Sequence, residues 1–404
     1  MALDVRIRLW IMMFLEFFIW GAWYVTMGTY LTEIKFDGVA VGSAYSTTSI
    51  AAILSPFFVG LVADRFLPGQ VVLGIMHLLG AGLLYYASTL HEAGTFFWVL
   101  LAYTLCYMPT ISLVNAISFH QMKDPGQEFP AIRVLGTIGW IAAGLLVGYL
   151  QIEKTSQPMV IGAGVSVVLG VFSFLLPNTP AKAKGEKISL GEIVGARALG
   201  LLKDPSFAIF TLCSLLICIP LSFYYNFTNV FLNENGVVNA AGKMTLGQGS
   251  EIFFMLVMPF FFARLGVKKM LLIGMLAWAA RYFLFAYGNS GSLVTMYYLG
   301  ILLHGVCYDF FFVTGQIYVD REAPDDVRAS AQGFIALITY GAGMYIGSIL
   351  SGMVVKQYQL MDGDKIVGHN WPSIWIVPAI MAIVITAIFF VTFKEKAKDN
   401  APAA

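Results

Sequence analysis

The chain has 404 residues, of which 58% are hydrophobic and only 12% are charged. Soluble domains carry about 25% charged residues, so this composition excludes an ordinary water-soluble protein and indicates an integral membrane protein. The net charge of +1 gives no reason to expect a nucleic-acid partner. The four cysteines lie in apolar runs without paired spacing, so we expect neither disulfides nor a metal site.

Apolar segments of about 20 residues, the length that crosses the hydrocarbon core of a membrane, recur along the chain. Twelve are separated by turns or charges: residues 8–31, 40–63, 68–90, 94–119, 128–150, 158–177, 206–232, 242–263, 268–288, 293–318, 328–355 and 372–393. A long polar connection separates the sixth from the seventh. We therefore expect an all-α integral membrane protein with twelve transmembrane helices. Its predicted parts are a six-helix half at 1–177, a cytoplasmic linker at 178–205, a second six-helix half at 206–394 and a tail at 395–404.

The distribution of lysine and arginine predicts the orientation, because cytoplasmic loops retain these residues. If the N-terminus is cytoplasmic, the cytoplasmic segments hold 17 of the 24 basic residues and the opposite loops hold 5. The remaining two, Arg133 and Arg281, lie within predicted helices. Both termini are therefore expected in the cytoplasm.

Short charged turns that contain glycine follow the second and the eighth segments. The first, GLVADRFLPGQ, contains Gly60, Asp64 and Arg65, and the second is FFARLGVKKM. Turns at equivalent places indicate two parallel six-helix repeats, although two unrelated basic loops would also fit. The Gly-x-x-x-Asp-Arg pattern of the first turn resembles the loop between helices 2 and 3 of the major facilitator superfamily. The resemblance implies that these three residues form a conformational loop.

Longer strings carry a more specific resemblance. FLEFFIWGAWYVTMGTYL, FPAIRVLGTIGW, MPFFFARLGVKKML, RYFLFAYG, GVCYDFF and RASAQGF occur in this order across nearly the whole chain. Together they resemble the nucleoside:proton symporter family. The resemblance implies a major facilitator fold that imports nucleosides with a proton, by alternating access through one central cavity. We accordingly expect a monomeric protein of the bacterial inner membrane, with the proton as coupling ion and no cofactor.

Glu16 is the first ionisable side chain within a predicted helix. Such a group costs about 2.5–3.5 kcal/mol at the bilayer centre, so each one is a functional hypothesis. The family resemblance implies an uncharged amide at this position, and a carboxylate there would change proton coupling or substrate contact. Glu16 is therefore a candidate proton-coupling residue. His77, on the third segment, is better explained as a hydrogen-bonded core histidine.

On the fifth segment, Arg133, Thr137 and Trp140 share one helical face because they are spaced at i, i+4 and i+7. A cation, a hydroxyl and an aromatic ring suit a polar ring compound such as a nucleoside. The alternative is that Arg133, which follows Pro130 closely, extends to the lipid headgroups. The resemblance favours substrate binding, since it implies substrate contacts at these three positions.

The seventh segment, PLSFYYNFTNVFL, matches the family less well. The resemblance implies polar amides at Ser222 and Tyr225, where this chain has none. Asn226 and Asn229 lie nearby and could replace them from an adjacent face. We expect Tyr225, Asn226 and Asn229 to contribute to substrate binding.

On the eighth segment, Gln248 and Glu251 are three residues apart and so share a face. An amide and a carboxylate there can hold a ribose hydroxyl or a base edge, and the resemblance implies binding roles for both. Glu251 is also a candidate for proton coupling. A structural hydrogen bond between helices is the alternative.

The tenth segment places His304 and Tyr308 on one face and turns Asp309 away by about 100° from Tyr308. We expect His304 and Tyr308 at the substrate. A carboxyl group in the membrane can hold and release a proton, so Asp309 is the leading candidate for proton coupling. Asp309 could instead pair with Arg281. The resemblance implies a tyrosine at position 304, so His304 bears on which substrate is accepted.

Other functions fit the sequence less well. The sequence HGVCYD resembles the His-x-x-x-x-Asp pair of glycerolipid acyltransferases, but on a continuous helix these side chains point about 140° apart. A channel is disfavoured because no filter-like loop occurs. Efflux of lipophilic compounds suits the polar residues poorly. The main alternative is a proton symporter of the same fold for a sugar or another small polar metabolite.

Overall fold

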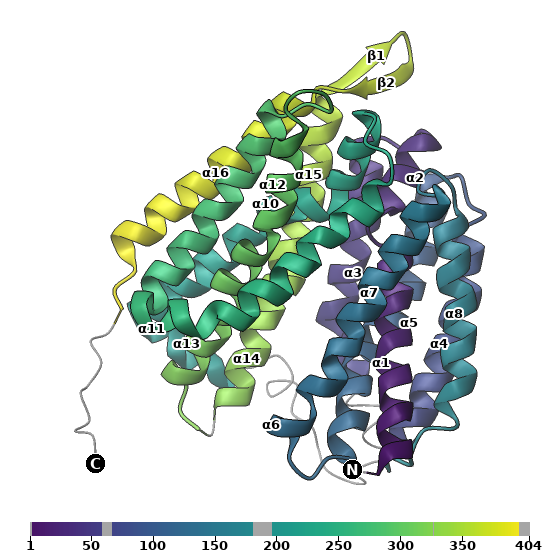
Figure 1. Ribbon diagram of the computed structural model, residues 1–404, viewed down its shortest axis with the longest axis vertical. Helices are drawn as coiled ribbons and strands as arrows, with labels where there is room; N and C mark the ends of the chain where they lie inside the picture. Colours follow the sequence, from purple (N-terminus) through teal and green to yellow (C-terminus); the bar gives the residue numbers. More distant parts are fainter. Residues whose placement is uncertain (1, 59–66, 181–195, 326, 396–404) are drawn as a thin grey trace.

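The structure is a computed structural model that describes residues 2–58, 67–180, 196–325 and 327–395. Its helices fall into two groups that lie side by side (Figure 1). The first group contains α1 (Leu3–Trp23), α2 (Met27–Glu33), α3 (Gly38–Phe58), α4 (Gly69–Ala87), α5 (Ala93–His120), α6 (Pro125–Glu128), α7 (Pro130–Leu150) and α8 (Gln157–Ser173).

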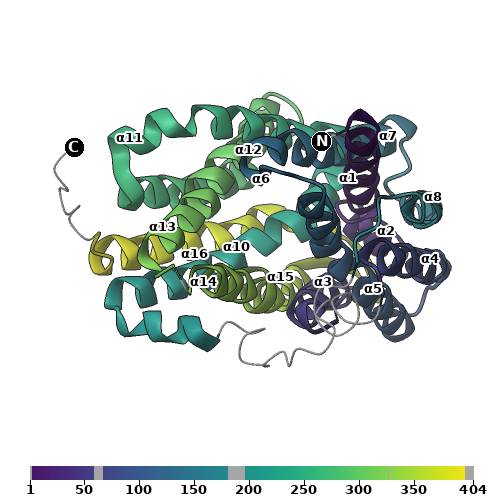
Figure 2. The same cartoon turned by 90° about the horizontal axis from the view of Figure 1, so that it is seen from below.

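The second group begins with a 3₁₀ turn, η2 (Ala196–Lys203). It continues with α10 (Pro205–Glu234), α11 (Ala240–Tyr287), α12 (Val294–Tyr308), η3 (Asp309–Val313), α13 (Thr314–Glu322), α14 (Arg328–Ala336), η4 (Leu337–Gly343), α15 (Met344–Gln357) and α16 (Trp371–Thr392). Seen from the end where the chain begins, the two groups remain separate bodies, and α3 faces α15 between them (Figure 2).

Within the described residues, ten helical segments are long and apolar enough to cross a membrane. The α11 helix, with 48 residues, would be about 72 Å long if straight, more than twice the thickness of a hydrocarbon core. It changes direction at Gly266, whose φ of 70° and ψ of 178° are not helical. The predicted segments at 242–263 and 268–288 are the two arms of this helix. The apolar α8 has only 17 residues.

A two-stranded antiparallel hairpin follows α15 and was not predicted. Strand β1 (Gln359–Asp362) pairs with β2 (Lys365–His369), and Asp362 lies opposite Lys365. The two-residue connection starts with Gly363, whose φ of 59° suits a tight hairpin turn. The hairpin projects from the end of the molecule opposite to the N-terminus (Figure 1), and we refer to these two ends as the hairpin end and the N-terminal end.

The two groups of helices meet closely at the hairpin end. There α3 packs against α15 so tightly that a Cβ atom on Gly42 would lie 2.3 Å from the carbonyl oxygen of Ser348. A Cβ atom on Gly352 would lie 2.4 Å from the carbonyl oxygen of Gly38. Only glycine permits this approach of two backbones. Just beyond it, Lys356 forms a 2.8 Å ion pair with Asp37.

A buried polar network joins the groups at the same end. Glu153, between α7 and α8, accepts hydrogen bonds from Asn229 (2.9 Å), Asn233 (2.8 Å) and the Ala241 amide (3.1 Å). Thr29 donates to the side-chain oxygen of Asn229. The hydrogen bonds of this network and the Asp37 ion pair thus all lie at the hairpin end. Toward the N-terminal end the ribbons of the two groups diverge (Figure 1).

Candidate functional site

A small pocket lies between the two groups of helices. Both groups line it, and its residues are Gly21, Val25, Trp140, Gly144, Tyr224, Tyr225, Ala241, Met244, Thr245 and Gln248. The wall is largely aromatic and apolar, with a few polar groups, which is the usual composition of a pocket for a small molecule. Predicted substrate residues from the fifth, seventh and eighth segments, Trp140, Tyr225 and Gln248, therefore meet at one place.

The α7 helix supplies a cation and an indole to this region. The Arg133 guanidinium lies 4.2 Å above the ring of Phe17 on α1, and its Nη1 is buried without a hydrogen-bond partner among the described residues. Arg133 therefore points into the first group and does not extend to the headgroups. Thr137 is half-buried one turn further along α7. Trp140 packs edge-on against Trp20, with ring centroids 5.5 Å apart.

A carboxylate and a histidine face each other on the second group. Glu251 Oε2, on α11, lies 3.8 Å from Nε2 of His304, on α12. Glu251 is partly exposed, at 21% of its side chain, whereas His304 is buried. Glu251 and Arg133 also interact electrostatically from opposite groups of helices. Glu251 therefore interacts with two other predicted binding residues, His304 and the cation Arg133.

Aromatic rings surround His304. Its ring stacks on Tyr224 at 5.2 Å and meets Tyr225 edge-on at 6.1 Å. Tyr308, one turn further along α12, shares a 2.7 Å hydrogen bond with the hydroxyl of Tyr340. The imidazole Nδ1 of His304 has no hydrogen-bond partner among the described residues. This nitrogen is a free polar group in an aromatic wall.

Asp309 is fully buried, and neither of its carboxyl oxygens has a hydrogen-bond partner within the described part of the chain. It begins the π-helical segment η3, a type of irregularity that often marks functional sites. The alternative pairing with Arg281 is not formed: Arg281 donates from Nε to the Gly300 carbonyl and lies over the ring of Tyr224. Because the helix continues through this region, His304 and Asp309 do not meet as a catalytic pair would.

Of the predicted site residues, Trp140, Tyr225 and Gln248 line the pocket, and three others are engaged elsewhere in the fold. Asn226 is fully buried and donates to Ser351 of α15. Asn229 belongs to the network of Glu153 at the hairpin end. Glu16 faces the interior of the first group, where it contacts His77. The predicted conformational loop of Gly60, Asp64 and Arg65 lies outside the described residues.

The sequence prediction missed several residues of the site. Tyr224 lines the pocket beside Tyr225, and the pair of tyrosines in SFYYNF was a readable signal. Gly21 and Gly144 also line it, since small residues leave space between close helices. Glu153 was not recognised because its partners Asn229 and Asn233 are 76 and 80 residues away.

Comparisons with known proteins agree with this arrangement. The family described as nucleoside H⁺ symporter matches residues 3–398 of the chain. The chain is 46% identical to a putative nucleoside transporter, YegT, of Escherichia coli K12, over 97% of this chain and 94% of that protein. It is 36% identical to the xanthosine permease of the same organism, over 99% of each protein.

A solved structure shows the same fold. The crystal structure of the nucleoside transporter NupG covers 98% of this chain and 100% of its own, with a TM-score of 0.89 and 33% identity. The matching family contains transporters, and the enzyme interpretation of HGVCYD is therefore wrong. From its sequence and its fold, the chain belongs to the nucleoside H⁺ symporter family.

Proposed function

We propose that this protein imports nucleosides together with protons, and that the pocket between the two groups of helices is the substrate site. The observation that carries the proposal is the pocket itself, lined from both groups by Trp140, Tyr225 and Gln248. A site between two bodies can be opened to either side of the membrane by a rocking motion.

The two groups correspond to a half at 1–177 and a half at 206–394, joined by the linker at 178–205 and followed by the tail at 395–404. Ten segments are long enough to span; dividing α11 at Gly266 adds one, and the 17-residue α8 adds another. This total supports our proposal of twelve transmembrane helices in a major facilitator fold. The excess of basic residues supports cytoplasmic termini in a bacterial inner membrane.

With this orientation, we propose that the structure represents the state closed toward the periplasm. The hairpin end is then periplasmic, and it is closed by the α3–α15 contact and by the network of Glu153. Alternating access requires these contacts to separate when the site opens to the periplasm.

We propose the following roles at the substrate. Trp140 and Tyr225 offer aromatic faces on which a nucleobase can stack. Gln248 can both donate to and accept from a base edge or a ribose hydroxyl. Arg133 and Glu251, from opposite halves, provide a strong donor and a strong acceptor, with Thr137, His304 and Tyr308 beside them. Because the substrate would contact polar groups of both halves, its binding would favour the conformation in which the two halves lie closer together.

We propose that Asp309 carries the coupling proton. It is fully buried with two unpartnered oxygens, so its charged form is not balanced by any hydrogen bond among the described residues. Protonation removes that cost. Glu251 is the second candidate, because it lies in the substrate region near His304. No cofactor has a role in this mechanism.

Uptake into proteoliposomes tests the proposal. Radiolabelled uridine, adenosine and xanthosine should accumulate when an inward proton gradient is applied, and an uncoupler should abolish accumulation. Asp309→Asn should still exchange substrate across the membrane but should not accumulate it. Uptake that ignores the uncoupler would refute proton coupling. If Asp309→Asn accumulates normally while Glu251→Gln does not, Glu251 is the proton carrier.

Arg133→Ala distinguishes the substrate site from a structural role. Losing a charged hydrogen-bond donor in a buried site should weaken binding by at least about tenfold. A stable, folded variant with unchanged affinity for every nucleoside would remove Arg133 from the site. Binding of sugars in preference to nucleosides would replace the proposed substrate.

A further inference from the structure

Arg281 is a fully buried cation in the second half, on the arm of α11 that follows Gly266. Its Nε donates a hydrogen bond of 2.9 Å to the backbone carbonyl of Gly300 on α12. The centre of its guanidinium group lies 4.0 Å from the ring centroid of Tyr224 on α10. Its Nη1 and Nη2 are buried and have no hydrogen-bond partner among the described residues. Arg281 therefore joins three helices, and no carboxylate in the described part of the chain accepts a hydrogen bond from it.

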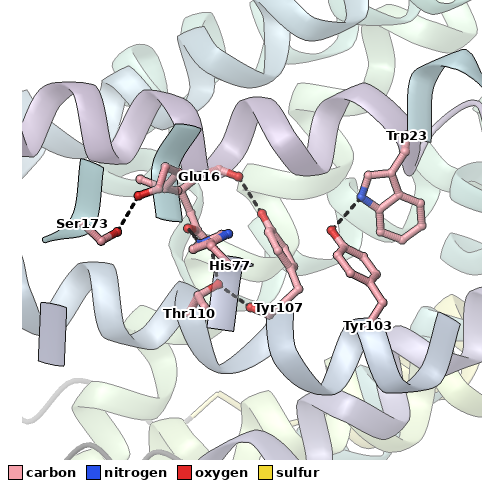
Figure 3. Close-up of polar contacts among 8 residues, drawn as sticks. Glu16, Trp23, His77, Tyr103, Tyr107, Thr110 and Ser173 are labelled. Atoms are coloured by element: carbon pink, nitrogen blue, oxygen red, sulfur yellow. Dashed lines mark hydrogen bonds and ion pairs between the residues drawn. The ribbon is translucent and has the colours of Figure 1, made fainter. Parts of the chain in front are cut away.

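A buried cation without a counter-ion is costly in the interior of a membrane protein. The buried acid of the first half, Glu16, has hydrogen-bond partners in His77 and Thr110 (Figure 3). An apolar side chain of similar length at position 281 would avoid the cost of burying an unpaired charge. Stability alone therefore does not explain an arginine at this position, and its two contacts indicate what the side chain does.

The first contact is with Tyr224, whose ring lies in the wall of the pocket. This ring stacks on the imidazole of His304, with centroids 5.2 Å apart and planes inclined by 18°. The Tyr224 hydroxyl is buried without a hydrogen-bond partner among the described residues, so the contacts of the ring itself hold this side chain in place. A cation over an aromatic ring is most strongly attracted where water is excluded. Arg281 therefore restrains the orientation of Tyr224.

The second contact is with the turn of α12 that carries His304. In an α-helix the carbonyl of residue 300 accepts from the amide of residue 304, one turn further on. Arg281 Nε donates to the same carbonyl and so holds this turn from outside the helix. Gly300 permits the close approach, because a Cβ atom there would overlap the ring of Phe285. Arg281 thus restrains one ring of the stacked pair directly and the other through its backbone.

The stacked pair is connected to the substrate region. Nε2 of His304 lies 3.8 Å from Oε2 of Glu251, whose side chain is partly exposed. Tyr225, which also lines the pocket, meets the rings of Tyr224 and His304 edge-on, at 5.6 and 6.1 Å. A shift of the stacked pair would therefore move the aromatic wall and the histidine that faces the carboxylate at the same time.

We propose that Arg281 is a positioning residue of the substrate wall. Its guanidinium group fixes the ring of Tyr224 and the α12 turn of His304, and these two rings support Tyr225 and Glu251 at the substrate. Arg281 is fully buried and does not touch the substrate itself. The expected effect on nucleoside affinity rests on the proposed function, whereas the placement of the two rings does not depend on it.

Three substitutions separate the charge of Arg281 from its size. Arg281→Met keeps a long side chain without charge or donor, Arg281→Gln keeps an amide donor, and Arg281→Lys keeps a cation without the planar guanidinium group. In calorimetric titrations, nucleoside affinity should fall by at least about tenfold in Arg281→Met and Arg281→Gln, and by less in Arg281→Lys. The melting temperature of Arg281→Met should not fall, because this variant lacks an unpaired buried charge.

The ring of His304 reports its own placement without any substrate. In protein labelled with ¹³C-histidine, its resonance is shifted by the ring current of Tyr224 and is identified by its loss in His304→Gln. This resonance should move in Arg281→Met and Arg281→Gln, and also in Tyr224→Leu, which removes the stacking ring. Tyr103→Phe is the matched control. It removes a buried hydroxyl that binds Trp23 in the first half (Figure 3), and should change neither the resonance nor the affinity.

A double substitution tests whether Arg281 acts through Tyr224. If it does, Arg281→Met should lower affinity little further in a protein that already carries Tyr224→Leu, because the two residues then belong to one interaction. Losses of affinity that add in full would overturn the route through Tyr224.

The remaining outcomes separate positioning from a merely structural role. Natural affinity and an unmoved His304 resonance in a folded Arg281→Met or Arg281→Gln protein would overturn the proposal. A lower affinity that accompanies a lower melting temperature, with the His304 resonance unmoved and no recovery in Arg281→Lys, would also overturn it. If the natural protein binds no nucleoside, the proposed function fails, and the His304 resonance still decides whether Arg281 places the two rings.

Discussion

Gly42 lies where α3 packs against α15, and its replacement by alanine should separate these helices at the hairpin end. The added Cβ would lie 2.3 Å from the Ser348 carbonyl oxygen and 3.0 Å from the Gly352 Cα. Both neighbours are backbone atoms, so no side-chain rotation relieves the overlap. Restoring an ordinary contact of 3.4 Å requires the two helices to move apart by about 1 Å, which a close-packed interface resists.

The size of the effect depends on how much the substitution changes the free energy of each conformation. Overpacking of a tight interface costs about 1–3 kcal/mol. Alanine also stabilises a helix by about 0.5–1 kcal/mol relative to glycine, but this gain is the same in both conformations and does not change their ratio. If the halves separate here during transport, only the conformation closed at the hairpin end is penalised. The population ratio should then shift by about 5–150-fold toward opening at that end.

Spin-label distances measure this shift directly. Labels at Glu33 and Gln357, which are exposed at the hairpin end on opposite groups, should report longer distances in Gly42→Ala than in the natural protein. Gly82→Ala is the matched control, because a Cβ at Gly82 in α4 would meet nothing within 4 Å. A distance distribution in Gly42→Ala that matches the control would refute the idea that this contact opens and closes.

Three further predictions concern the same cycle and its site. Glu153→Ala removes the carboxylate that accepts from Asn229, Asn233 and the Ala241 amide across the two groups, so it should destabilise the closed hairpin end by at least about 2 kcal/mol, measured by the same spin labels. Burial raises the pKa of Asp37, but hydrogen bonds from Lys356 and the Ala40 amide outweigh it and lower the pKa below 3.8. A carboxyl group whose pKa is lowered by folding stabilises the folded state at pH values above its unfolded-state pKa, and this stabilisation is lost as the pH falls. The Asp37–Lys356 ion pair should therefore persist at neutral pH and break only as the pH falls below about 4. Its contribution to stability should be about 0–1 kcal/mol and should decrease at high salt concentration. Trp140→Ala should weaken nucleoside binding by about tenfold through lost stacking, and Trp140→Phe should restore most of it in a calorimetric titration.

Properties that depend on local periodicity were predictable from the sequence. Segments of apolar residues located the membrane helices, and the spacing of Gln248 and Glu251 placed them on one face. Breaks inside a helix were less accessible: nothing local distinguishes the π-helical segment at Asp309 from the α-helix before it. The hairpin after α15 could have been read from its Asp-Gly-Asp turn, but a short strand pair gives a weak signal beside long apolar helices.

Partnerships between distant residues were not predictable. The sequence offers Asn226 and Asn229 as polar groups on a membrane helix, and such groups serve either a substrate or a neighbouring helix. The choice depends on which helix faces them, and here Ser351 and Glu153 do so. Glu16 illustrates the same limit, because its partner His77 is 61 residues away and lies on another helix.

The way the buried acids are paired supports our proposal that proton coupling lies in the second half. In the first half, Glu16 has a hydrogen-bond partner at each carboxyl oxygen. In the second, both oxygens of Asp309 and the Nδ1 of His304 have no partner among the described residues. A fully satisfied group gains nothing from a change of protonation, whereas an unsatisfied acid in a membrane is sensitive to each change around it. Since His304 lies 3.8 Å from Glu251, a substrate that engages Glu251 alters the electrostatic surroundings of the whole α12 wall. Protonation would therefore act in the second half, while the substrate would contact both halves.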